Sequence, residues 1–206
     1  MPTNGCALIS DRRGTAFALL AAGRGARFGP GKLTADLAGK PLWRRSVDAA
    51  FEASIDAIVV VTNDAAIAAM CAAEGWQAVA NPDAASGIAS SVQVAARATD
   101  EFDRTIVALA DMPFVEPAHI AALVAAGGTA FTCLPGGRPG VPAAFDRAGR
   151  ARLAVLTGDR GAAALDWPDA HLIQPADPES LLDVDTPEAL ERARALAVRR
   201  WPAASR

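Results

Sequence analysis

The chain has 206 residues, a formal net charge of −3 and a hydrophobic fraction of 51%. This length fits one domain with a single buried core. The sequence pI near 5.4 argues against nucleic acid as a partner, because proteins that bind nucleic acids present a basic surface to the phosphates. Glycine and proline interrupt the most apolar stretch, so we also expect no membrane-spanning segment.

Short apolar runs alternate along the chain with longer alanine-rich segments of helical spacing. This alternation is typical of βαβ units and of a mainly parallel sheet. The strands that we expect, in chain order, are Ala16 to Ala21, Ala57 to Thr62, Trp76 to Ala80, Thr105 to Ala110 and Ala130 to Leu134. The helices that alternate with them are Pro41 to Ala53, Asp64 to Glu74, Ser90 to Ala98 and Pro117 to Ala126.

The pattern is less regular after this point. A stretch rich in glycine and proline, Pro135 to Pro142, precedes a helix that we expect around Arg147 to Leu156. The last helix begins at Thr186, a residue type that commonly caps helix N-termini. We expect the segments that follow the strand Thr105 to Ala110 to form an extension over the sheet.

The domain organisation that we predict is a flexible tail over residues 1–14 and a single domain over residues 15–200. Three cysteines lie far apart in the sequence and match no metal-ligand spacing, which is typical of a cytoplasmic protein.

A glycine-rich loop follows the first expected strand. It reads LAAGRGARFG from Leu20 to Gly29, and Lys32 comes shortly after it. Its glycines let backbone amides converge on an anion, and its basic side chains add positive charge, so we interpret it as a triphosphate-binding loop. A dinucleotide fingerprint would need glycine in place of Phe28, and a Walker A loop would need glycine in place of Ala26 and serine or threonine in place of Leu33.

An aspartate follows the strand that we expect at Thr105 to Ala110. Asp111 should therefore lie at the carboxyl edge of the sheet, where open α/β folds bind their ligands. Mg²⁺ prefers carboxylate and phosphate oxygens together, so Asp111 is a candidate metal ligand.

The glycine-rich loop resembles the signature of the MobA-like NTP transferases. Its form, LAAGxGxRFGxxK, is closest to that of the molybdenum cofactor cytidylyltransferases, whereas the guanylyltransferase branch usually shows LAGG. The resemblance covers residues 16–196, and further matches follow in the family order: Asn81-Pro82 with Gly87 and Ser90-Ser91-Val92, then Ala110-Asp111-Met112-Pro113, Gly158-Asp159-Arg160-Gly161-Ala162, and Asp183-Val184-Asp185-Thr186-Pro187-Glu188.

The resemblance implies a Rossmann-like fold of the nucleotide-diphospho-sugar transferase type, with a mainly parallel sheet and helices on both faces. It implies that Asp185 is a second metal ligand beside Asp111, with Asp183 as the alternative. It also implies the nucleotide-binding residues Leu20, Ala21, Ala22, Gly23, Arg24, Gly25, Arg27, Lys32, Asn81, Gly87, Ser90, Ser91 and Asp111, of which Lys32, Arg27 and Asp111 are expected to be catalytic. Ser90 has an alternative role as a helix N-cap.

The activity that the resemblance implies is transfer of CMP from CTP, with Mg²⁺, to the phosphate of a molybdopterin-type cofactor. An anionic phosphate acceptor needs no general base, and we assign no catalytic role to His119 or His171. The expected partners are CTP or another NTP, a phosphorylated pterin and a molybdoenzyme that receives the cofactor, and the chain is expected to be a monomer or a homodimer.

Two positions depart from the family pattern on the acceptor side. Val141 stands where family members commonly have histidine or asparagine before the proline, and Ala163 stands where they tend to have arginine. Three alternatives therefore remain: guanylyl transfer, nucleotidyl transfer to another phosphorylated metabolite, and a non-catalytic nucleotide-binding module that assists cofactor insertion. A hydride-transfer enzyme is disfavoured by Phe28.

Overall fold

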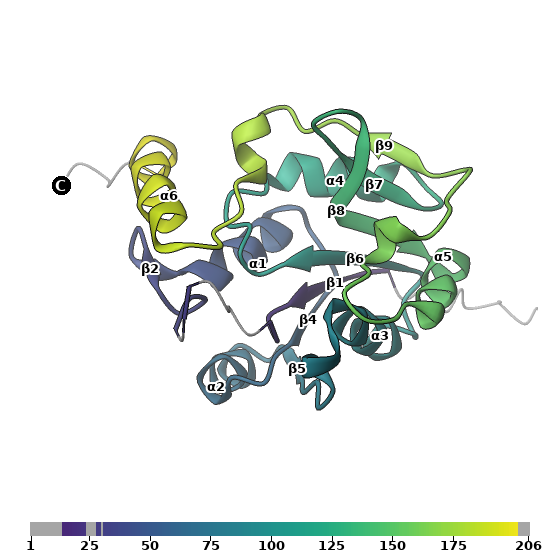
Figure 1. The fold of residues 1–206 in the computed structure, drawn as a ribbon, viewed down its shortest axis with the longest axis horizontal. Coiled ribbons are helices and arrows are strands. Elements are labelled where there is room, and N and C mark those ends of the chain that lie inside the picture. The colour runs from purple at the N-terminus through teal and green to yellow at the C-terminus, as the bar shows by residue number, and fades with distance from the viewer. Residues whose placement is uncertain (1–13, 24–27, 30, 202–206) are drawn as a thin grey trace, which may run out of the picture.

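A computed structural model describes residues 14–23, 28–29 and 31–201 (Figure 1). Its centre is a seven-stranded sheet in the order β5-β4-β1-β6-β8-β7-β9. The strands pair in parallel except for β8, which is antiparallel to β6 and β7. Their bounds are β1 (Thr15–Leu20), β4 (Ala57–Val61), β5 (Gln77–Val79), β6 (Arg104–Leu109), β7 (Ala130–Leu134), β8 (Arg138–Asp146) and β9 (His171–Ile173).

Helices cover both faces of the sheet, as expected. Side chains along β1 alternate between two hydrophobic clusters, with Phe17 and Leu19 in one and Ala18 and Leu20 in the other, because successive strand residues point to opposite faces. The first cluster packs against α1 (Leu42–Glu52), α2 (Ala65–Ala73) and α4 (Pro117–Ala125). The second packs against α3 (Ile88–Ala98) and the short turn Leu153–Val155 that follows α5 (Arg147–Arg152).

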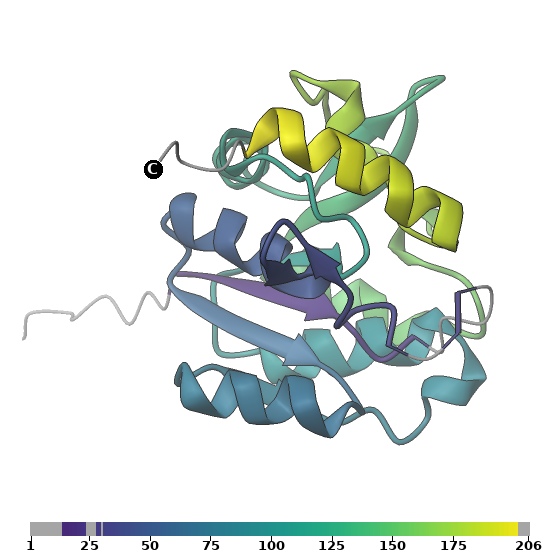
Figure 2. The ribbon, with the colours of Figure 1, turned by 90° about the vertical axis from the view of Figure 1, so that its left-hand side faces the viewer.

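The C-terminal helix lies apart from these layers. Thr186 caps α6 (Pro187–Arg200) as predicted, since its hydroxyl accepts a hydrogen bond of 3.2 Å from the Ala189 amide. Figures 1 and 2 show α6 beside the small hairpin of β2 (Asp36–Leu37) and β3 (Lys40–Pro41). A third buried cluster joins this helix to the hairpin and to the segment after β6; it includes Leu37, Leu42, Phe114, Leu190 and Leu196.

Three expectations about elements were wrong. The stretch Pro135 to Pro142 does not only connect elements, because most of it belongs to β8, which inserts between β6 and β7. The segments after β6 consequently add β7, β8 and β9 to the same sheet and do not form a separate extension over it. Helix α3 begins at Ile88 after Gly87, so Ser90 lies inside the first turn and is not the N-cap.

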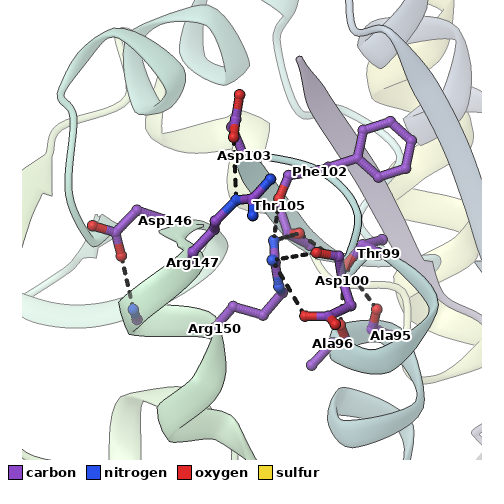
Figure 3. A network of polar contacts seen from close by, with 11 residues as sticks. Ala95, Ala96, Thr99, Asp100, Phe102, Asp103, Thr105, Asp146, Arg147 and Arg150 are labelled. Carbon is purple, nitrogen blue, oxygen red and sulfur yellow. Dashed lines mark hydrogen bonds and ion pairs between the residues drawn. The ribbon is translucent and has the colours of Figure 1, made fainter. Parts of the chain in front are cut away.

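A buried arginine ties α5 to the turn that precedes β6 (Figure 3). Arg150 is 3% exposed and donates hydrogen bonds to the carbonyl oxygens of Asp100 and Phe102, at 2.9 and 2.8 Å, and to Thr105 Oγ1 at 3.1 Å. The planar guanidinium group suits this fork of acceptors, because its five N–H groups are fixed in direction. The contacts hold the amino end of β6 in place.

No helix in the described part of the chain combines the length and the apolar character needed to cross a membrane.

Candidate active site

A cavity of about 940 Å³ opens at the carboxyl edge of the sheet. It lies where the strand order reverses around β1, with β4 and β5 on one side and β6 on the other, which is where open α/β sheets bind ligands. The segments that follow β1, β4 and β6 line it, together with the start of α3 and the segment before α6. Its polar and charged lining residues include Lys32, Asn63, Asp64, Ser91, Asp111, Asp159, Asp183 and Asp185.

Three aspartates meet at one end of this cavity. Each of Asp111, Asp183 and Asp185 offers a carboxylate oxygen, and these oxygens lie within 4.8 Å of one another. A backbone hydrogen bond of 2.9 Å, from the Val184 amide to the Asp111 carbonyl, brings the segment before α6 beside the end of β6. Asp111 and Asp185 therefore lie together, as the family resemblance implied, and the alternative ligand Asp183 lies in the same group.

Lys32 bridges two of these carboxylates. Its Nζ donates to Asp111 Oδ2 at 2.7 Å and to Asp185 Oδ1 at 2.9 Å, and the residue is only 7% exposed. Burial by itself would lower the pKa of the ammonium group, but the hydrogen bonds and charges of the two aspartates outweigh it and raise the pKa. Lys32 is thus a buried, fully charged group in the floor of the cavity.

The aspartates suit a divalent cation. Carboxylate oxygens are the ligands that Mg²⁺ takes in proteins. Asp111 Oδ1 is buried and has no hydrogen-bond partner among the described residues, so the oxygen could coordinate an ion without losing a protein contact. Asp111, Asp183 and Asp185 are the residues that would hold the ion.

Negative charge is concentrated at this point. Much of the Asp183 residue is exposed, yet its carboxyl group faces the cavity, where desolvation and the charges of Asp111 and Asp185 raise its pKa to about 7. A cation among these groups would favour the ionised form of all three carboxyls.

The glycine-rich loop forms another wall of the cavity. Leu20, Ala21, Ala22 and Gly23 line it from the end of β1, and Gly29 and Gly31 line it further along, with φ angles of +93° and +82° that favour glycine. Three predicted residues, Arg24, Gly25 and Arg27, lie outside the described residues. The position of the described part, beside the aspartates, is the one that the triphosphate-binding interpretation requires.

Asn81 supports the wall and does not line the cavity. It is 1% exposed, and its Nδ2 donates to the hydroxyls of Ser90 and Ser91, both at 2.9 Å. Its backbone amide and carbonyl bond to the side chain of Asn63, at 2.9 and 2.8 Å. Of these predicted residues, Ser91 lines the cavity. Asn81 thus holds the loop between β5 and α3 in place, and its partner Asn63 lines the cavity.

Gly87 lies against the turn at Gly158 and Asp159. The Ala89 amide donates to the Gly158 carbonyl at 3.1 Å, and Gly87 has a φ angle of +110°. A Cβ at Gly87 would overlap the Gly158 carbonyl and the Asp159 side chain. Only glycine allows the two segments to approach this closely.

We expect the substitution Gly87→Ala to lower the free energy of unfolding by about 2 kcal/mol, because it combines an unfavourable φ angle with this overlap. Thermal or urea unfolding measures the change. Gly161→Ala is the matched control, since Gly161 has a φ angle of −79° and no neighbouring atom within reach of a Cβ. Equal stability of the two variants would contradict the close-packing interpretation.

The model of the MobA-like NTP transferase domain matches residues 17–171 of the chain. The chain belongs to the MobA-like NTP transferase family.

Individual proteins are also similar to the chain. The chain is 38% identical over 129 residues to a 3-deoxy-manno-octulosonate cytidylyltransferase of Anaeromyxobacter sp. (strain Fw109-5), covering 59% of this chain and 52% of that protein. It thus spans about half the length of the curated relatives that it matches. A nucleotidyl transferase of Methanothermobacter has the same fold, with a TM-score of 0.79, 20% identity and coverage of 91% of this chain and 99% of that one.

A further solved structure similar to this chain contains a metal ion. A Mycobacterium tuberculosis protein in complex with manganese has a TM-score of 0.69 and 25% identity, and the match covers 88% of this chain and 98% of that one. Among the described residues of this MobA-like chain, Asp111, Asp183 and Asp185 form a group that could hold a metal ion.

Some cavity residues of this MobA-like transferase were not predicted. Asn63 and Asp64 follow β4 directly, so the reasoning that placed Asp111 at the carboxyl edge would also have placed them there. Asp159 also lines the cavity; it lies in the matched motif Gly158 to Ala162, to which we had assigned no role. The two departures, Val141 and Ala163, do not line this cavity; Val141 packs against the core and Ala163 is exposed.

Proposed function

We propose that this chain is a nucleotidyltransferase that moves CMP from CTP to the phosphate of a molybdopterin-type cofactor and releases pyrophosphate. The observation that carries the proposal is the meeting of Lys32 with Asp111 and Asp185, which lie 79 and 153 residues away in the sequence, beside the glycine-rich loop. A cation-binding group next to a loop suited to anions is the arrangement needed to hold an NTP with its metal.

The reaction that fits this site is an in-line displacement. An oxygen of the acceptor phosphate attacks the α-phosphorus of CTP, the bond from the α-phosphorus to the bridging oxygen breaks, and pyrophosphate leaves. Bound Mg²⁺ would supply neutralisation of charge on the phosphate oxygens. Lys32 and the loop amides hold the reacting phosphates and offset the charge that develops on them.

A phosphate acceptor also agrees with the position of the histidines. A phosphate monoester is already anionic at neutral pH, with a second pKa of about 6, so its attack needs no general base. His119 is buried in α4 with its Nε2 2.8 Å from Thr132 Oγ1, burial lowers its pKa, and neither it nor His171 lines the cavity.

The second candidate is cytidylyl transfer to the hydroxyl of a 3-deoxy sugar acid. The 38% identity to a 3-deoxy-manno-octulosonate cytidylyltransferase favours it. Both candidates use CTP, so the relative supports the donor in either case, and only the acceptor differs.

Ligand-induced stabilisation tests the donor. We expect CTP with Mg²⁺ to raise the unfolding temperature more than GTP, ATP or UTP, because a ligand at 100 times its dissociation constant stabilises the folded state by about 2.7 kcal/mol. Pyrophosphate release with a molybdopterin acceptor and with a 3-deoxy sugar acid then distinguishes the two candidates. Stabilisation by CTP without pyrophosphate from either acceptor would instead indicate a nucleotide-binding module.

A further inference from the structure

Lys32 contacts the same carboxylates that suit a divalent cation. Its Nζ is within hydrogen-bond distance of Asp111 Oδ2 and Asp185 Oδ1, and both residues belong to the group of three aspartates. A positively charged group of the protein therefore already shares the oxygens that would bind the metal. The two cations cannot both use these oxygens without strong repulsion at such short range.

The bridge also limits the negative charge of the site. Carboxyl groups whose oxygens lie within 4.8 Å of one another repel when they ionise, and the ammonium group offsets part of that repulsion. Burial of Lys32 strengthens the effect, because charges that are shielded from water interact more strongly. Without Lys32 the same oxygens would attract a divalent cation more strongly.

A bound nucleotide would offer the Lys32 ammonium group an alternative partner, a phosphate oxygen. It follows Gly31 in the part of the chain that lines the cavity beside the glycine-rich loop, where a triphosphate would lie. Lysine carries a compact charge on a flexible four-carbon stem, so its ammonium group can exchange a carboxylate partner for a phosphate oxygen. The phosphates would draw Lys32 away from the carboxylates and leave them to the metal.

We propose that Lys32 is a built-in counter-ion that competes with the divalent cation for Asp111 and Asp185 and is released by the phosphates of the nucleotide. This inference rests on the proposed function for the position of the triphosphate. Its consequence is positive coupling between metal and nucleotide: each raises the affinity of the other by the same factor. The metal then binds tightly only together with its substrate.

Mn²⁺ binding to the full chain tests this, measured by electron paramagnetic resonance or calorimetry with and without CTP. For the wild type we expect CTP to tighten Mn²⁺ binding at least about 10-fold, within the range of ordinary coupling. Lys32→Met should bind Mn²⁺ without nucleotide at least about 10-fold more tightly than the wild type, and should lose most of the coupling.

Three variants make the result specific. Lys32→Arg keeps the charge and should keep weak binding of Mn²⁺ without nucleotide. Lys32→Met combined with Asp111→Asn should lose the tight binding, which places the ion at this group. Lys40→Met is the matched control, because Lys40 is half-exposed and pairs with Asp48; it should bind Mn²⁺ as the wild type does.

The proposal is overturned if folded Lys32→Met binds Mn²⁺ no more tightly than the wild type when nucleotide is absent. Circular dichroism confirms the fold of each variant, and Lys32→Gln replaces Lys32→Met should the latter not fold. The Mn²⁺ measurement needs neither acceptor nor turnover. If Lys32→Met bound Mn²⁺ tightly but the wild type released no pyrophosphate, the proposed function would be wrong and the counter-ion proposal would stand.

Discussion

Asp111→Asn is expected to lower turnover at least about 100-fold, on the scale of losing one group that stabilises the transition state. Asp111 lies just after β6, its Oδ2 accepts a hydrogen bond from the Lys32 ammonium group, and its Oδ1 is buried without a hydrogen-bond partner among the described residues. Asparagine has nearly the same shape but no charge, so it removes the attraction for a cation and for Lys32 while leaving the fold in place. The measurement is pyrophosphate release with CTP, Mg²⁺ and the acceptor that supports turnover.

Asp83→Asn is the control for this substitution. Asp83 is exposed near the cavity without lining it, and its side chain caps no helix. It should keep the turnover of the wild type. If Asp111→Asn also turned over like the wild type at saturating Mg²⁺, the assignment of Asp111 as a metal ligand would be wrong.

Arg150→Met is expected to lower the free energy of unfolding by about 3 kcal/mol, the largest effect on stability that we predict. The substitution keeps the apolar volume but leaves the part-buried carbonyl oxygens of Asp100 and Phe102 without the buried guanidinium group that donates to them. It also removes the donor to Thr105 Oγ1 (Figure 3). Urea unfolding at neutral pH measures the loss.

Arg147→Met is the matched control on the same helix. Arg147 makes a single ion pair with Asp103, at 3.2 Å, and its side chain is 59% exposed. Exposed pairs of this kind contribute little because water screens both charges, so we expect a change within about 0.5 kcal/mol. A similar loss of unfolding free energy in both variants would contradict the argument that the hydrogen bonds of buried Arg150 contribute more than the exposed ion pair of Arg147.

The acceptor end of the site is the part that the family resemblance describes least well. Val141 and Ala163 replace residue types that could bond or neutralise a phosphate, and the structure places neither in the cavity wall. The turn that carries Asp159 approaches the cavity instead, held by the contact of Gly158 with the start of α3.

The amino-acid sequence by itself determined most of the larger elements and one edge of the site. Alternation of apolar runs with helical segments predicted β1, β4, β5, β6 and β7 and the helices between them, because strand and helix periods are local properties. The rule that ligands bind beyond strand ends placed the glycine-rich loop and Asp111 at the same edge. Asp111 and the described part of the loop line the cavity at this edge.

The tertiary structure alone decided how distant segments meet. The sequence did not predict the strand β8, because the segment contains glycine and proline, which normally mark turns. Its pairing with β6 and β7 is what makes it a strand. The bridge of Lys32 to Asp111 and Asp185 likewise forms through tertiary contacts, among them the backbone hydrogen bond from Val184 to Asp111. Such contacts between residues far apart leave no periodic signal in the chain, because they arise from packing and not from local conformation.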